Sequence, residues 1–448
     1  MNAPTLDFAA TTPAVPGTRY VVDRILAGCL CGILMAAVAM FGATGDTGLF
    51  VLEAGAAALL LGWSLRQMAA GAVRLPETPL FVPLLLFAMI VALQAVTGGF
   101  AYWYAARTEI LKYFAYGCFF LAAAHLFSHN RERLTFLWMF TVFGALIAAL
   151  AIAQDVTAPG RIFWIWPVAT SGHVFGPYAD HSNYAGLMEM LSPLPLALAL
   201  STSRAGVRAF CSLAALWMTA SVVLCGSRGG VLALIAEAAV MAILLLHRFG
   251  RRRTAKRIAA FAAVAIVFIA LITPRRVIAS LWALHSPLTA SGAGDRLAIT
   301  RDTLSMLREK PLLGWGLGSF PVVYPQFRSF PTEYFVNQAH NDYAQAWTEM
   351  GLLGFCVVLL FLALLFRAGV RNALDPRRDL LALAALVGCT GIAVHSLTDF
   401  NLHIPANAAL FYVLAAAATV GARRPVIGTA RHPAPAQVGY NRRTPHAG

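Results

Sequence analysis

Long apolar runs dominate this chain of 448 residues. A helix needs about 20 mostly apolar residues to cross a membrane, and about twelve stretches approach that length. Their residues do not alternate in polarity, as the strands of a membrane barrel would. We therefore predict an all-α integral membrane protein with about twelve transmembrane helices. The predicted spans cover residues 24–42, 48–64, 80–97, 110–127, 134–153, 183–200, 208–225, 229–247, 256–273, 349–367, 379–397 and 403–420.

The composition supports this interpretation. Hydrophobic residues make up 59% of the chain, charged residues only 12%, and the mean hydropathy is +0.69. A soluble protein averages about 25% charged residues, so this chain has too little charge to cover the surface of a soluble globule of its size. The composition excludes a soluble multidomain enzyme.

Basic residues predict the orientation, because Lys and Arg concentrate in the cytoplasmic loops of membrane proteins. If the N-terminus lies inside, the short outer loops contain only Arg107, Arg161 and Arg228. The opposite orientation would reverse this bias, so we place both termini in the cytoplasm. Anionic lipid head groups explain the basic inner loops, which lack the interleaved aromatic residues of a nucleic-acid site.

This orientation divides the chain into five parts. We expect a disordered cytoplasmic N-terminus (1–20), helices one to nine (21–273), a large outer loop between helices nine and ten (274–345), helices ten to twelve (346–420) and a disordered cytoplasmic tail (421–448). A second long outer loop runs from about Gln154 to Ser182. Long loops in a compact protein are usually functional or disordered.

The larger outer loop has the composition of a folded segment. Within it, Asp295 to Lys310 reads as an amphipathic helix that Pro311 ends, with Leu297, Leu304 and Leu307 on one face. The loop also contains many aromatic residues, so we expect it to pack near the membrane surface. They are Trp282, Trp315, Phe320, Tyr324, Phe327, Phe330, Tyr334 and Phe335.

Neither a disulfide framework nor a metal or cofactor site is predicted. The cysteines lie in or beside apolar runs and none forms a Cys-x-x-Cys pair, so we interpret them as small core hydrophobes. The chain has no HExxH motif and no Walker loop. The seven cysteines are Cys29, Cys31, Cys118, Cys211, Cys225, Cys356 and Cys389.

Ser227-Arg228-Gly229-Gly230 forms a predicted tight turn at the outer face. Glycines allow a sharp turn and the close approach of a ligand, and the helix that follows presents free N–H groups and its positive dipole end. An arginine there suits phosphate. Two interpretations remain open: a phosphate site that includes Ser227, Arg228 and Gly229, or a plain turn with an interfacial arginine.

Two arginines of the outer loop, Arg296 and Arg301, could add to this positive centre. The alternative is that they pair with loop carboxylates such as Asp295 or Asp302, and we favour this pairing for Arg301.

His340-Asn341-Asp342-Tyr343 lies at the outer entrance to the tenth predicted helix. A neutral imidazole could take a proton from a sugar hydroxyl, although a plain hydrogen-bonded surface histidine is the alternative. If 340–349 is one straight helix, His340 and Glu349 point apart, so we predict no dyad between them. Asp342, Gln345 and Glu349 should instead share a face.

Further polar residues could line the same cleft. Of the group before the sixth helix, His181 and Asn183 are the better candidates, because they lie at its mouth. Of the group between the eleventh and twelfth helices, we favour a role in closing the turn for Asp399 and Asn401. The two groups are His173, Tyr178, Asp180, His181 and Asn183, and His395, Asp399, Asn401 and His403.

In order and spacing, these motifs resemble the O-antigen ligase and O-antigen polymerase superfamily of bacterial polytopic membrane glycosyltransferases. The resemblance covers roughly residues 175–415. Each motif alone is weak, and the ordered set is specific for the superfamily but not for one member. The matching stretches are 227–230, 311–320 (PLLGWGLGSF), 340–343, 349–354 (EMGLLG) and 395–407 (HSLTDFNLHIPAN).

The resemblance implies an enzyme of the inner membrane that works without a cofactor on the periplasmic side, where the large loop would lie. The donor would be a glycan on undecaprenyl diphosphate, and the acceptor lipid A-core or a growing polysaccharide. His340 matches the essential histidine, proposed as the base, and Arg228 and, less closely, Arg296 match the diphosphate-binding arginines. Asn341, Tyr343, Arg301 and His395 remain possible cleft residues. Asp180-His181-Ser182-Asn183 departs from the family's pattern.

Three other functions remain open on the sequence. A polymerase that extends the lipid-linked chain is the closest alternative, and a protein glycosyltransferase belongs to the same class. A secondary anion transporter would suit twelve helices, but transporters show paired halves and polar residues at the midplane. Glu189 and Glu237 lie inside apolar runs, where each could pair helices or hold an ion.

Overall fold

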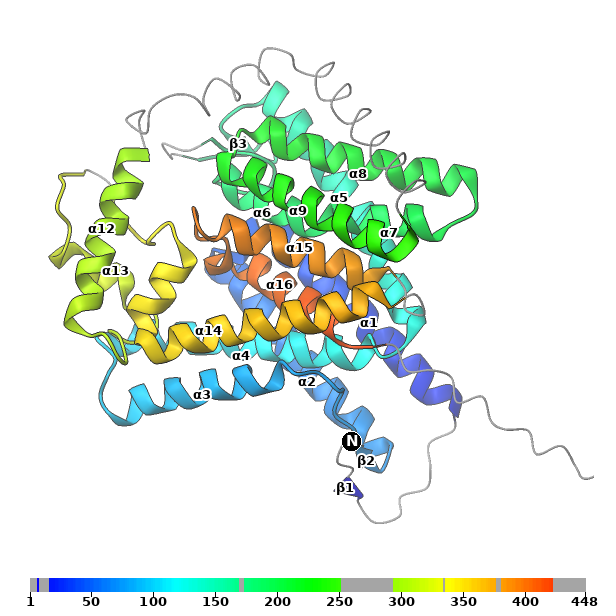
Figure 1. The fold of residues 1–448 in the computed structure, drawn as a ribbon, viewed down its shortest axis with the longest axis horizontal. Coiled ribbons are helices and arrows are strands. Elements are labelled where there is room, and N and C mark those ends of the chain that lie inside the picture. The colour runs from blue at the N-terminus through cyan, green and yellow to red at the C-terminus, as the bar shows by residue number, and fades with distance from the viewer. Residues whose placement is uncertain are drawn as a thin grey trace, which may run out of the picture.

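The computed structural model describes residues 6–7, 16–168, 173–250, 293–332, 335–375 and 380–421. Several predicted features lie outside the described residues. They are the span 256–273, the first part of the large loop with Trp282, the two residues Glu333 and Tyr334, and most of both terminal segments. The described chain is a bundle of helices (Figure 1). The helices are α1 (Pro16–Ala39), α2 (Asp46–Ala69), α3 (Phe81–Val96), α4 (Trp103–Leu126), α5 (Asn130–Thr157), α6 (His181–Leu191), α7 (Pro193–Ser201), α8 (Ala205–Cys225), α9 (Arg228–Phe249), α12 (Ala293–Glu309), α13 (Phe320–Val323), α14 (Asp342–Leu374), α15 (Leu381–His395) and α16 (Pro405–Thr419).

Short elements complete the described chain. Two antiparallel pairs of two-residue strands join β1 (Leu6–Asp7) to β2 (Ala72–Val73) and β3 (Arg161–Ile162) to β4 (Trp166–Pro167). Three 3₁₀ turns are η1 (Phe41–Ala43), η2 (Tyr324–Gln326) and η3 (Asn401–His403).

The all-α architecture is confirmed, and it includes helices that could cross a membrane. Among the described residues, seven helical segments are long and apolar enough to cross a membrane, with α6 and α7 together as one segment, 181–201. The helices α3, α15 and α16 are apolar but shorter. The predicted number of twelve spans is not confirmed.

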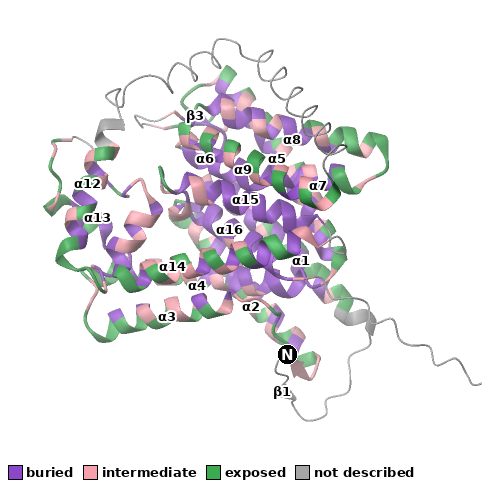
Figure 2. Cartoon of the chain, viewed as in Figure 1, coloured by how far each residue is buried: buried purple, intermediate pink, exposed green. Residues whose placement is uncertain are grey.

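The helices α15 and α16 form the centre of the bundle. Both are buried along nearly their whole length, and Figure 2 shows them surrounded by helices with exposed outer faces. α15 packs against α6, α9, α14 and α16, and α16 packs against α4. Their many alanines allow this close packing, as in other membrane helices. The exposed side of α3 remains apolar, with Val82, Leu85 and Met89 more than half exposed, which suits contact with lipid.

Five of the seven cysteines are buried, as predicted for core residues. Cys29 and Cys356 are exposed, so the prediction is wrong for these two. An apolar run in a membrane protein places residues on its lipid-facing side as well as in the core. All seven are free thiols.

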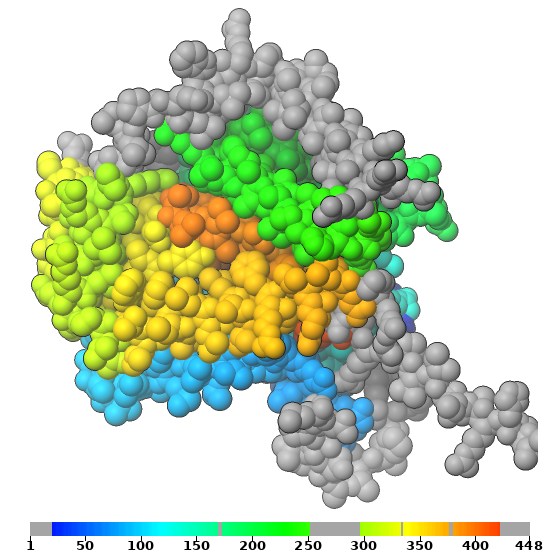
Figure 3. Space-filling view, viewed as in Figure 1, coloured from blue at the N-terminus to red at the C-terminus, as the bar shows by residue number. Residues whose placement is uncertain are grey.

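Helix α14 runs across one face of the molecule between α3 and α15 (Figure 3). It breaks at Gly351, where φ is 64° and ψ is −170°. The segment Pro311–Gly316 fills the break. Leu352 and Leu353 donate their N–H groups to the carbonyls of Pro311 and Leu312, and Trp315 and Gly316 donate theirs to Thr348 and Glu349. These bonds satisfy backbone groups that the broken helix leaves unpaired.

Helix α12 has nearly the predicted bounds, but of the three leucines predicted to form its apolar face only Leu307 is buried. Leu297 and Leu304 are 59% and 49% exposed. The buried side lies half a turn away, where Ile299, Asp302, Thr303 and Met306 recur at helical spacing. That side packs on the aromatic loop, since Ile299 and Met306 form one cluster with Phe320, Val323 and Tyr324, against which Trp315, Phe327 and Phe330 pack.

Candidate functional site

The turn that follows α15 brings distant parts of the chain together. The carboxylate of Asp399 lies 3.3 Å from Nη2 of Arg296 and 3.4 Å from Nδ1 of His340. Nη1 of Arg296 also donates to the carbonyl of Thr398, at 3.2 Å. α12, the entrance to α14 and the end of α15 therefore meet at one carboxylate. Two of the predicted site residues, Arg296 and His340, share this partner.

Asp399 is a buried anion, with 1% of its surface exposed. Burial raises the pKa of the carboxyl group. The hydrogen bond with His340 and the positive charge of Arg296 together lower the pKa by more than burial raises it. The net effect holds the pKa well below the ordinary value. Asp399 therefore remains a carboxylate that can orient His340 and neutralise part of the charge of Arg296.

Two neighbours hold His340 in place. Its φ is 51°, in the left-handed region that residues other than glycine seldom adopt. The next residue, Asn341, caps α14: its Oδ1 accepts from the N–H groups of Tyr343 and Ala344, and its Nδ2 donates to the carbonyl of Leu397. The ring of Phe400 meets the imidazole edge-on, with centroids 4.9 Å apart. The imidazole is 24% exposed, so it is fixed and yet accessible.

The Ser227–Gly230 segment forms the predicted helix entrance. Ser227 caps α9 and accepts from the N–H of Gly230 at 3.1 Å. Arg228 is the first residue of α9 and is exposed, and its side chain has no hydrogen bond or ion pair to any residue that the structure describes. Its guanidinium is therefore free to bind an anion.

Gly229 places α9 against the turn that holds Asp399. A Cβ on Gly229 would lie 2.6 Å from Cδ2 of His395 and 2.6 Å from Oγ1 of Thr398. The close packing of α9 against this turn therefore requires a glycine at position 229, and its role in binding a ligand stays a prediction. The same contact places the backbone next to Arg228 beside the Thr398–Asp399 turn.

His181 is the first residue of α6 and its side chain is partly exposed, whereas Asn183 is inside the bundle. Oγ of Ser227 donates to Oγ of Ser182 at 3.4 Å, which joins the entrances of α6 and α9. Asn183 is buried, and its carbonyl accepts from Nδ2 of Asn407 at 2.9 Å. His181 is therefore the better placed of the two cleft candidates.

The other cleft candidates have local roles or stay exposed. Tyr343 donates to the carbonyl of Ala393 at 2.7 Å and ties α14 to α15. Arg301 is exposed and makes no ion pair with Asp302, whose carboxylate accepts instead from Tyr324 and from the N–H of Ser329. The expected Arg301–Asp302 pair is therefore absent. His395 is only 1% exposed and lies beneath the site rather than in an open cleft.

Glu349 is engaged away from His340, as predicted. Its Oε2 accepts from the N–H of Gly318 at 2.8 Å, and its Oε1 accepts from Nε2 of Gln345 at 3.2 Å. The second bond agrees with the predicted face shared by Gln345 and Glu349. Glu349 anchors the glycine-rich loop to α14.

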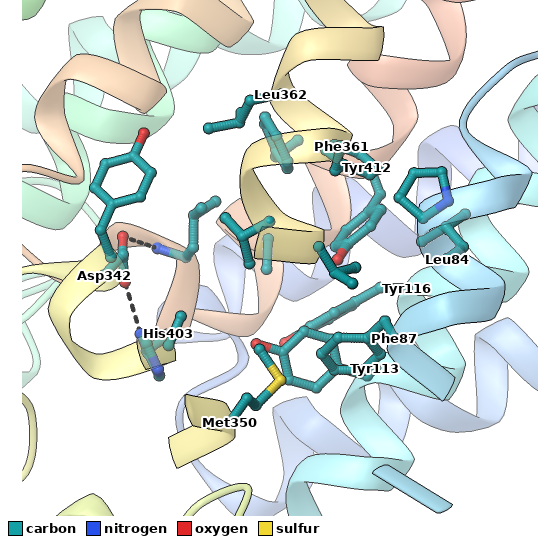
Figure 4. A pocket seen from close by; sticks show the side chains of 18 of the residues that line it. Leu84, Phe87, Tyr113, Tyr116, Asp342, Met350, Phe361, Leu362, His403 and Tyr412 are labelled. Carbon is teal, nitrogen blue, oxygen red and sulfur yellow. Dashed lines mark hydrogen bonds and ion pairs between the residues drawn. The ribbon is translucent and has the colours of Figure 1, made fainter. Parts of the chain in front are cut away.

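A cavity of about 110 Å³ lies behind the first turn of α14, between α3, α4, α14 and α16 (Figure 4). At one side, the carboxylate of Asp342 lies 2.7 Å from Nδ1 of His403. Asp342 also accepts from Ser396 and from the N–H of Leu402, so it fixes the same turn that contains Asp399. The other walls are mostly apolar or aromatic and include Leu84, Phe87, Tyr113, Tyr116, Met350, Phe361 and Tyr412.

Asp399 is the residue whose role the sequence did not reveal. The prediction that it closes the turn is only part of its role, since it also binds His340 and Arg296. The signal available was an aspartate next to a histidine-containing motif, without any indication of its partners. In the part of the chain that the structure describes, no group of three or more His, Cys, Asp or Glu side chains could hold a metal ion.

Comparison with known proteins adds one family match. Residues 213–359 match the family model described as O-antigen ligase. The matched region includes Arg228, Arg296 and His340, and ends before Asp399. No curated protein matches the chain. The match confirms the resemblance to the O-antigen ligase superfamily.

Proposed function

With residues 213–359 matching the O-antigen ligase family as the premise, we propose that this multi-pass membrane protein is a glycosyltransferase. It moves a glycan from undecaprenyl diphosphate to an acceptor hydroxyl on a lipid A-core sugar. The observation that carries the proposal is the carboxylate of Asp399, which joins His340 to Arg296. A base and a cation thereby lie at one site, as group transfer from a diphosphate requires.

His340 acts as the base. Nδ1 faces Asp399, so a proton on Nδ1 leaves the lone pair of Nε2 for the acceptor hydroxyl. The hydroxyl oxygen forms a bond to the anomeric carbon while Nε2 takes its proton. The bond between the anomeric carbon and the diphosphate oxygen breaks, and its electron pair leaves with the lipid diphosphate. A single displacement of this kind inverts the anomeric centre.

Arg228 and Arg296 stabilise the leaving diphosphate. Arginine binds phosphate oxygens with two parallel hydrogen bonds, and fixed cations are most effective where negative charge develops in the transition state. Arg228 also stands at the N-terminus of α9, where free N–H groups favour an anion. These groups supply the charge stabilisation without a metal ion.

The cavity beside α14 supports a lipid-linked substrate. Its apolar walls lie on α3, α4, α14 and α16, of which α14 is long and apolar enough to span a membrane, and its polar side contains Asp342 and His403. A hydrocarbon chain in this cavity would place a polar head group near His340, which is two residues before Asp342. Basic inner loops favour a site that faces the periplasm from the inner membrane.

Complementation tests the proposal. A strain without its surface-polysaccharide ligase receives the wild type, His340→Ala or Arg228→Ala, and lipopolysaccharide is separated on a gel. We expect the wild type alone to restore long glycan on lipid A-core. Glycan that grows longer but stays on the lipid carrier would identify a polymerase instead.

Two control variants match these changes. His247→Ala alters an exposed histidine at the opposite end of α9, and Arg308→Ala alters an exposed arginine on α12. Both should restore glycan as the wild type does, at equal protein level. A wild type that restores nothing, together with anion flux in proteoliposomes, would contradict the glycosyltransferase and favour a transporter.

A further inference from the structure

A histidine–carboxylate pair is buried inside the bundle, beneath the candidate site. Nδ1 of His395, at the end of α15, lies 2.9 Å and 3.2 Å from the two carboxylate oxygens of Glu189 on α6. Glu189 is 0% and His395 1% exposed. Contact with both oxygens fixes the rotation of the imidazole ring.

Such a pair is costly in a membrane protein. Ionisable side chains within membrane helices are rare and generally mark functional sites. Apolar residues of similar size often stabilise a protein as well as a buried ion pair does. Stability alone therefore gives no reason for Glu189 and His395 at these positions.

The free edge of the imidazole faces the entrance of α9. Nε2 of His395 is buried and has no hydrogen-bond partner among the described residues. A Cβ on Gly229 would lie 2.7 Å from this nitrogen, and a Cβ on Gly230 would lie 3.1 Å from Oε1 of Glu189. The Glu189–His395 pair thus packs against the first turn of α9.

His395 also supports the turn that contains Asp399. Its carbonyl accepts hydrogen bonds from the N–H groups of Thr398 and Asp399 and from Oγ1 of Thr398. Thr398 in turn accepts from Arg296. His395 therefore contacts the backbone beside Arg228 through its imidazole and supports the turn that binds Arg296 through its carbonyl.

We propose that Glu189 and His395 are positioning residues that set the spacing between Arg228 and Arg296 for the two phosphates of the donor. This inference rests on the proposed function. Glu189 fixes the orientation of the His395 imidazole, and the imidazole sets the distance between Arg228 and Arg296. This distance selects a diphosphate over a monophosphate. Displacing a group by about 1 Å can cost on the order of a hundredfold in rate, so a rotated ring should weaken diphosphate binding at least about tenfold.

Binding of farnesyl diphosphate and farnesyl monophosphate to the purified full chain, measured by calorimetry, tests the inference without any transfer reaction. The main variant is the double change Glu189→Leu with His395→Leu, because removing both partners avoids an unpaired buried charge. We expect it to unfold at a temperature close to that of the wild type. It should lose affinity for the diphosphate while it keeps affinity for the monophosphate.

Gly229→Ala and Glu237→Gln complete the design. The first adds a methyl group against the other edge of His395 and should also lower the preference for diphosphate. The second variant removes the buried carboxylate of Glu237, which lies on α9, as Gly229 does. Glu237 packs against Gly391 rather than His395, so this variant should leave the preference for diphosphate unchanged.

The outcomes are distinct. A double variant that binds diphosphate as the wild type does, or that loses both ligands equally, would overturn the inference, as would an equal loss in Glu237→Gln. A wild type without any preference for the diphosphate would overturn the proposed donor site itself.

Discussion

Oδ1 of Asp399 lies 3.4 Å from Nδ1 of His340, a residue 59 positions earlier in the chain. This contact orients the imidazole, as the proposed role of His340 as a base requires. The same carboxylate binds Arg296, so the proposed base and the cation share one partner.

Asp399→Asn should therefore reduce glycan transfer strongly, on the order of a hundredfold, because an amide can leave His340 with its proton on the wrong nitrogen. The measurement is the initial rate with purified protein, compared with Asp46→Asn at an exposed position. A rate within twofold of the wild type would contradict the role of Asp399.

The His403–Asp342 pair should make stability depend on pH. Burial lowers the pKa of His403, but the hydrogen bond and negative charge of Asp342 raise it more, so the net pKa lies above its ordinary value of 6.5. A raised pKa in the folded state gives stabilisation that is complete below pH 6.5 and is lost as pH rises through the higher value. Thermal unfolding between pH 6 and 9 should show this loss for the wild type and a flatter profile for His403→Gln. Parallel profiles would contradict the assignment.

Gly351→Ala should destabilise the protein by about 3 kcal/mol or more. The residue occupies a region of φ and ψ that only glycine adopts readily, and a Cβ there would overlap the backbone of Leu312 and Leu313. Thermal unfolding in detergent measures the effect. Gly117→Ala is the control, because a Cβ at that glycine meets nothing within 4 Å.

Ala346→Leu should fill part of the cavity beside α14. If the cavity holds a hydrocarbon chain, KM for a long-chain donor should rise several-fold, while KM for a short-chain donor stays the same. Ala54→Leu, on the exposed side of α2, should change neither value. An equal rise for both donors would rule out a hydrocarbon chain in this cavity.

Local signals in the sequence predicted the helices well. Runs of apolar residues identified the membrane helices, and Pro311 correctly indicated the end of α12. The buried face of α12 was not predictable in the same way, because apolar residues occupy both sides of it. Leu297 and Leu304 compete with Ile299 and Met306, and only the aromatic loop determines which side is buried.

The candidate site could be predicted only in part. The prediction of no dyad assumed one straight helix over 340–349, whereas α14 begins at Asp342 and His340 lies outside it. The contacts of Glu349 nevertheless agree with the prediction. The partners of Asp399 and His395 depend on how α6, α9, α12 and α15 pack. Contacts across more than 50 residues leave no periodic pattern in the sequence.

The segment Pro311–Gly316 repairs the break in α14 with four backbone hydrogen bonds. If the segment moved away, the N–H groups of Leu352 and Leu353 would lose their hydrogen-bond acceptors. In a membrane, where little water can replace these acceptors, the loss would cost several kcal/mol for each group. We therefore expect the segment Pro311–Gly316 to stay in place rather than to open and close over the site. In the proposed reaction, donor and acceptor therefore reach His340 by a route that leaves this segment in place.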